Sequence, residues 1–170
     1  MKKVQIITEL SVFLAVALIL SYVEHVVFSD IVMPGIKLGI SNITVLLILY
    51  RYNFPTALGF GVVKSSLSVF FTGRFGSLFF SLSGIVLAVI VMALLKKSEK
   101  FSLLGVNVSG SVSHIIGQLC VAMFVIGSDV WRILPLLMIF AVISGILMYF
   151  PAMGCLKQIE KSEQWLIKNS

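Results

Sequence analysis

The chain has 170 residues, of which 59% are hydrophobic and 12% charged, and its mean hydropathy is +1.09. The surface of a water-soluble globule needs about a quarter charged residues, so this composition excludes a soluble enzyme and predicts an integral membrane protein. A spanning helix needs about 20 apolar residues, and about six of them with short loops would use nearly the whole chain. We therefore expect one membrane domain without a separate catalytic or nucleotide-binding part.

The net charge of +6 does not indicate a nucleic-acid partner. The 13 Lys and Arg residues lie mostly at the ends of apolar segments, as the positive-inside rule for membrane proteins predicts. The two cysteines, Cys120 and Cys155, fall in different apolar segments without metal-ligand spacing. We expect no disulfide framework, no metal site and no cofactor.

Six apolar segments predict an all-α bundle of transmembrane helices. After Met1-Lys2-Lys3, the first apolar stretch is longer than the core of a signal peptide and lacks a cleavage site, so we expect a retained helix. Pro151 and Gly154 are expected to break the sixth helix, which leaves a membrane domain over 1–155 and an amphipathic cytoplasmic tail over 156–170. The predicted helices cover residues 4–27, 38–52, 55–73, 76–95, 106–126 and 131–150.

The distribution of basic residues predicts the topology. With the N-terminus inside, the cytoplasmic segments carry nine Lys and Arg residues, whereas the outer loops carry only Lys37, Arg74 and Arg132. Because basic residues stay on the cytoplasmic side, both termini are predicted to be cytoplasmic in a multi-pass protein of the cell membrane.

Lys64 lies in the middle of the third predicted helix, where a charge costs at least about 2.5–3.5 kcal/mol. It must therefore face a polar cavity, a counter-ion or a bound anion. The alternatives are a structural pair with Glu24 or a side chain that extends to the membrane interface. On the fifth helix, His114 and Gln118 are four residues apart and share one face. They could hydrogen-bond a ligand, or join helices to one another as polar residues in membrane bundles do.

Further polar residues gather at the predicted outer ends of the first three helices. If these helices converge, the residues form a pocket with Lys64 at its floor, and the number of cations favours an anionic ligand. Each single charge could also simply be solvated. These residues are Glu24, His25, Asp30, Lys37, Asn42 and Arg74.

Enzyme signatures are missing from the chain. It contains no GxxxxGK[ST] phosphate loop, no GxSxG, no HExxH and no DDxxD motif. We therefore expect no catalytic activity, and any active transport would need a partner ATPase.

Four ordered stretches resemble the family labelled heptaprenyl diphosphate synthase component I, also called the Gx transporter family. They are LSYVE from Leu20, PGIKLGISNI from Pro34, GRFGSLFFSLSG from Gly73 and FSLLGVNVSGSVSHIIGQL from Phe101. The first name implies a non-catalytic membrane component of prenyl diphosphate, menaquinone or membrane redox metabolism, bound to a prenyl synthase subunit. The second implies kinship with the substrate-binding S components of energy-coupling factor (ECF) vitamin transporters.

The two names imply different partners, and the sequence favours the transporter. An S component binds a small-molecule substrate in the bilayer and docks through its first helix on a coupling protein that carries two ATPases. That resemblance implies docking through Ser11, Ala15, Ala17 and Ser21, small residues spaced four apart. The predicted substrate-binding residues, for a small anionic metabolite or vitamin, are Glu24, Lys37, Asn42, Lys64, Arg74, His114 and Gln118.

Overall fold

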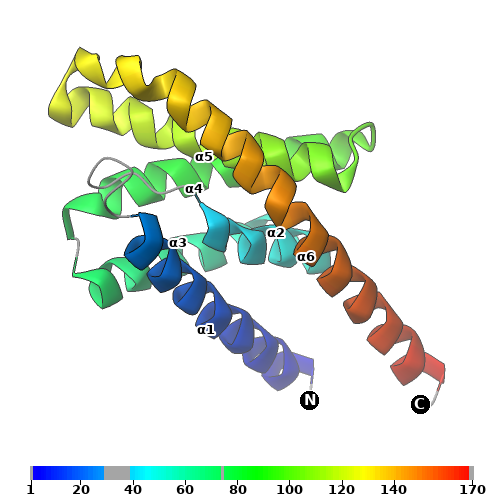
Figure 1. Ribbon diagram of the computed structural model, residues 1–170. Helices are drawn as coiled ribbons and strands as arrows, with labels where there is room; N and C mark the ends of the chain where they lie inside the picture. Colours follow the sequence, from blue (N-terminus) through cyan, green and yellow to red (C-terminus); the bar gives the residue numbers. More distant parts are fainter. Residues whose placement is uncertain (1, 29–38, 74, 169–170) are drawn as a thin grey trace.

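The computed structural model describes residues 2–28, 39–73 and 75–168, and every regular element in these ranges is helical (Figure 1). The described ranges contain six α-helices and three 3-10 helices. The α-helices are α1 (Lys2–Phe28), α2 (Ile43–Arg51), α3 (Phe54–Thr72), α4 (Leu78–Ser98), α5 (Leu103–Ile126) and α6 (Leu134–Lys168), and the 3-10 helices are η1 (Ile40–Asn42), η2 (Phe75–Ser77) and η3 (Ser128–Ile133).

Five of these helices are long and apolar enough to cross a membrane, namely α1, α3, α4, α5 and α6. The predicted all-α polytopic membrane fold is thus confirmed. The helix α2 differs from the other five. Its nine residues rise only about 14 Å, which is half of the hydrocarbon thickness of about 30 Å.

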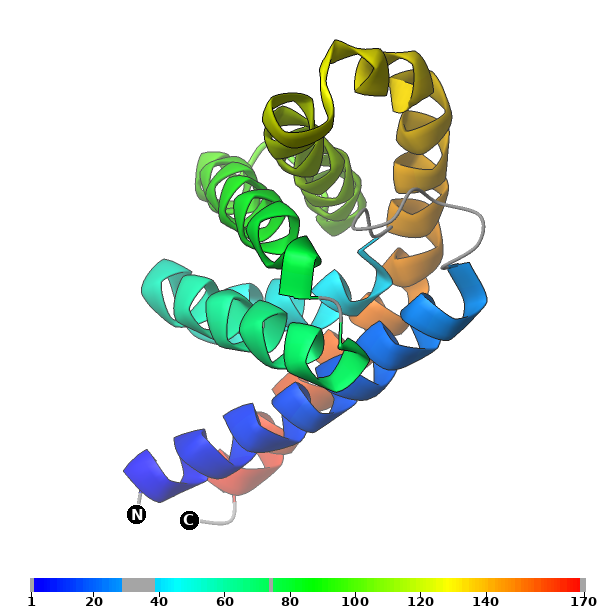
Figure 2. The same ribbon diagram turned by 90° about the vertical axis from the view of Figure 1, so that its left-hand side faces the viewer.

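The short helix α2 lies inside the bundle rather than beside the lipid. Every side chain from Ile43 to Leu49 is buried, and α2 contacts α1, α3, α4 and α6. The apolar core around it includes Leu46 and Ile48 of α2 with Ile85 and Val89 of α4. The other helices surround this core, with α4, α5 and α6 packed in succession and α1 lying against α3 at the edge (Figures 1 and 2).

The predicted break in the sixth helix is wrong. The helix α6 continues through Pro151 to Lys168. Proline removes one hydrogen bond of the ladder, but neighbouring helices can compensate in membrane proteins, and Ala152 next to it is fully buried in the core around α2. Residues 156–168 therefore continue α6, and their placement on the membrane surface stays a prediction.

The two ends of the described chain lie at the same end of the molecule. Both views show the start of α1 and the end of α6 projecting from the bundle in the same direction (Figures 1 and 2). This arrangement is the one expected if both termini lie on one side of the membrane. Which side that is stays a prediction.

Candidate functional site

Buried polar side chains gather in the middle of the bundle. Of the seven predicted substrate-binding residues, five lie in the described ranges, and all five are buried: Glu24, Asn42, Lys64, His114 and Gln118. They come from α1, η1, α3 and α5. The other two, Lys37 and Arg74, lie outside the described residues, as does Asp30 of the proposed outer rim.

Lys64 is 4% exposed and points into the bundle. Its ammonium group donates a hydrogen bond to Asn42 Oδ1 at 2.7 Å. The side chain therefore does not extend to the membrane interface, which was one of the alternatives. A buried ammonium group is costly unless its environment is polar, and here the polar environment is built by the turn that precedes α2.

Glu24 holds the other side of the same turn. Its Oε1 accepts a hydrogen bond from the backbone N–H of Gly39 at 2.6 Å. Gly39 has a φ of 85°, and a Cβ atom there would lie 2.7 Å from the Asn42 amide nitrogen and 3.3 Å from the His114 ring. Only glycine fits this backbone and this space. The segment from Gly39 to Asn42 is thus held between an acid on α1 and a base on α3.

Small residues of α4 and α5 place His114 and Gln118. The two helices touch where a Cβ atom on Gly117 would lie 2.6 Å from the Ser83 carbonyl oxygen, and Ser83 Oγ donates to the Gly117 carbonyl at 2.9 Å. Close approach through small residues is typical of membrane helices. Because α4 and α5 approach so closely, the His114 ring packs against Gly84. A hydrogen bond of 3.0 Å joins His114 Nε2 to Gln118 Nε2.

Three of the five buried side chains lie at one cavity of about 10 Å³, which has room for about one water molecule. Gly39, Asn42, Lys64 and His114 line it. Among the described residues, the Asn42 Nδ2 and Ser81 Oγ atoms make no hydrogen bond although both are buried. The arrangement can present an ammonium, amide, imidazole and hydroxyl groups to a ligand, provided that the cavity widens.

Sequence reasoning missed the hydroxyl groups of this cavity. Five serines contribute to its wall, namely Ser21, Ser41, Ser65, Ser68 and Ser81. A signal was present, because Ser68 follows Lys64 by four residues and therefore lies on the same helix face. Serine is nevertheless common at ordinary helix contacts in membranes, which hides such a signal.

The four small residues predicted for docking divide between two faces of α1. Ser11 and Ala15 are exposed, and Ser11 Oγ bonds back to the Ile7 carbonyl of its own helix at 2.8 Å. Ala17 and Ser21 are 0% and 1% exposed, and the Ser21 hydroxyl hydrogen-bonds Ser68 of α3. Only Ser11 and Ala15 therefore face outward.

A second polar cluster joins α1 to the end of α2. Glu9 accepts hydrogen bonds from Arg51 Nε at 3.0 Å and from the Tyr52 hydroxyl at 2.8 Å. Burial, followed by the hydrogen bond and the negative charge of Glu9, raises the pKa of Tyr52 above its usual 10.0. The phenol therefore stays protonated and keeps donating to Glu9 throughout the neutral range.

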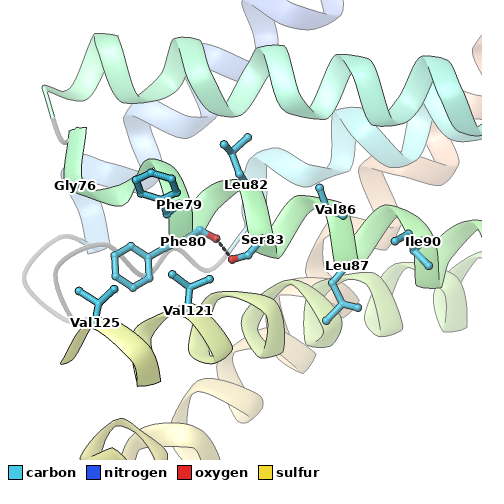
Figure 3. A pocket seen from close by; sticks show the side chains of 10 residues that line it. All are labelled: Gly76, Phe79, Phe80, Leu82, Ser83, Val86, Leu87, Ile90, Val121 and Val125. Atoms are coloured by element: carbon cyan, nitrogen blue, oxygen red, sulfur yellow. Dashed lines mark hydrogen bonds between the residues drawn. The ribbon is translucent and has the colours of Figure 1, made fainter. Parts of the chain in front are cut away.

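An apolar groove runs along α4 on the surface of the bundle, separate from the central cavity. It has a volume of about 660 Å³. Figure 3 shows Phe79, Val86 and Ile90 in a row on α4, with Val121 and Val125 of α5 alongside. Ser83 is its one hydroxyl, and this group is bonded to the carbonyl groups of Phe80 and Gly117.

Comparison with known proteins identifies a family that the chain matches. The family model described as heptaprenyl diphosphate synthase component I matches residues 13–153. No curated protein and no solved structure matches the chain significantly. The matched range contains the whole central cavity and the groove along α4.

Proposed function

Since this chain belongs to the heptaprenyl diphosphate synthase component I family, we propose that it is the membrane-embedded, substrate-binding subunit of an uptake system in the cell membrane. Its substrate is a small anionic metabolite or vitamin, and a partner ATPase module supplies the energy. The chain itself catalyses no reaction. The observation that carries the proposal is the convergence of three buried polar side chains, those of Asn42, Lys64 and His114, on one cavity.

The ligand's anionic group would take the place of the Asn42 side chain on Lys64. The ammonium group now donates to Asn42 Oδ1 at 2.7 Å, and a carboxylate or phosphate oxygen is the stronger acceptor. Asn42, His114 and Gln118 would then select the ligand through hydrogen bonds. Glu24 Oε1 accepts a hydrogen bond from the same turn, so a donor group of the ligand should face this carboxyl group.

The partner would be an ECF coupling protein with its ATPases, docked on the outward face of α1. The exposure of Ser11 and Ala15 supports this role, because small residues let a second helix approach closely in the membrane. The cavity of about 10 Å³ is closed to such a ligand. Docking and release would therefore open and close it.

Purification from the native membrane in mild detergent, followed by mass spectrometry of bound proteins and small molecules, tests the proposal. The wild type should carry a coupling protein, two ATPases and a small acid. Lys64→Met should keep the proteins and its melting temperature but lose the small acid, because the buried cation is gone. The matched control, Lys157→Met on the exposed side of α6, should keep both. A Lys64→Met protein that still carries the same molecule would refute the site.

A second candidate is a non-catalytic membrane component of prenyl diphosphate, menaquinone or membrane redox metabolism that associates with a prenyl synthase subunit. The family's description and the apolar groove of about 660 Å³ along α4 favour it. The same purification distinguishes the two functions. Recovery of a soluble prenyl synthase with an isoprenoid, and no ATPase, would replace the transport proposal with this one.

A further inference from the structure

We propose that the surface of α4 binds one anionic phospholipid, with its phosphate at Lys96 and Lys97 and an acyl chain along the helix toward Ile90. This site is separate from the central cavity and does not depend on the proposed transport function. It rests on the shape of two adjoining hollows and on the charge at one end of them.

The two hollows adjoin one another on α4. The first, of about 660 Å³, extends along α4 from Gly76 to Ile90 (Figure 3). The second, of about 560 Å³, begins at Ile90 and ends at Lys96, Lys97 and Glu99. Ile90 lines both hollows. Together they make a groove that follows α4 for about 30 Å, which is the thickness of the hydrocarbon layer.

The walls of this groove are apolar and face outward. Val86, Ile90 and Leu94 are exposed, and they lie in a segment of spanning length and high hydropathy. Hydrocarbon is the solvent for such side chains in a bilayer. An acyl chain is therefore the occupant that matches the walls.

The charge at one end of the groove selects the headgroup. Lys96 is held in place, because its Nζ donates to the Leu49 carbonyl at 2.7 Å and lies 4.8 Å from the centre of the Tyr50 ring. An ammonium group carries three N–H donors, so it can bind a phosphate oxygen as well. Lys97 is exposed beside it, and Glu99 is the one carboxylate of the second hollow. Two cations against one anion favour a lipid with net negative charge over a zwitterionic one.

Native mass spectrometry of the protein released from nanodiscs tests this proposal. The nanodiscs contain equal amounts of phosphatidylglycerol and phosphatidylcholine with identical chains. The wild type should retain mainly phosphatidylglycerol. Lys97→Gln should lower the ratio of the two retained lipids by about fivefold, the effect of one lysine near a membrane surface. Lys97 is chosen because Lys96 also supports the end of α2.

Two further variants distinguish binding at this site from a general attraction of anionic lipids to exposed lysines. Ala93→Trp fills the second hollow without changing charge and should reduce the retention of both lipids. Lys157→Gln removes an exposed charge on α6 and should leave the ratio unchanged. An unchanged ratio in Lys97→Gln, or an equal fall in Lys157→Gln, would overturn the proposal. So would the recovery of a prenyl lipid, in place of a phospholipid, with protein purified from native membranes.

Discussion

Glycines around the central cavity fix the position of its imidazole. A Cβ atom on Gly84 would lie 2.8 Å from the His114 ring and equally close to the His114 backbone oxygen. The ring could shift, but the backbone oxygen belongs to α5 and can move only if the two helices separate. Gly84 therefore sets both the α4 to α5 distance and the place of a predicted ligand-binding group.

We expect Gly84→Ala to destabilise the protein by about 1–3 kcal/mol, the usual cost of overpacking. Thermal unfolding in detergent measures this effect. The control is Gly59→Ala in α3, where a Cβ atom meets nothing within 4 Å, and alanine there should raise stability by about 0.5–1 kcal/mol. Equal melting temperatures for Gly84→Ala and wild type would contradict the tight contact.

At the scale of elements, the two faces of α1 differ in exposure, and we predict different effects of substitutions on them. Ala15→Leu should leave the melting temperature unchanged but abolish co-purification of a coupling protein, because Ala15 is exposed. Ser21→Leu should instead lower stability by about 1–3 kcal/mol through overpacking, since Ser21 is 1% exposed and contacts Ser68. Val12→Leu, at an exposed position of the same helix, serves as the control. Retention of the coupling protein by Ala15→Leu would refute docking through this face.

The short helix α2 connects the central cavity to the opposite end of α1. Asn42 directly before it binds Lys64, and Arg51 and Tyr52 at its end bind Glu9 of α1. A helix of nine residues behaves as a rigid rod over this distance. Displacement of Asn42 by a ligand would therefore move the whole of α2 and change the contacts of Glu9. Glu9 lies two residues before Ser11 of the proposed docking face.

How far the sequence predicts these elements depends on their surroundings. Hydropathy locates α1, α3, α4 and α5 within a few residues because long apolar runs identify spanning helices. It does not reveal that α2 is enclosed by protein, since lipid and protein interiors are equally apolar. It also cannot orient α1, whose apolar residues cover every face, so Ala17 and Ala15 look equivalent in the sequence.

The sequence identifies only part of the central site, namely the polar residues that are unusual in a membrane helix. Lys64, Glu24, His114 and Gln118 stand out because charge and amide groups are costly in the bilayer. The serines and Gly39 do not stand out, because their role depends on a turn in which the backbone N–H of Gly39 meets Glu24. Such contacts between distant segments have no local sequence signal.

At the scale of the whole molecule, the common direction of both chain ends makes the topology testable. After replacement of Cys120 and Cys155 by alanine, we expect an impermeant maleimide added to intact cells to label Asp129→Cys but not Ser98→Cys, since both positions are exposed in the bundle. The lysines next to Ser98 place it inside by the positive-inside rule. Permeabilised cells, in which both cysteines should react, provide the control. Labelling of Ser98→Cys alone in intact cells would invert the topology.

The continuity of α6 through Pro151 has a mechanical consequence. Its 35 residues rise about 50 Å, whereas the hydrocarbon layer is about 30 Å thick. Several turns at its C-terminal end must therefore project beyond this layer as an uninterrupted extension of the rod that packs against α5 and α2. A small tilt of this helix inside the bilayer therefore becomes a larger sideways displacement at Lys161. With the predicted topology, that displacement occurs on the cytoplasmic side, where other proteins can detect it.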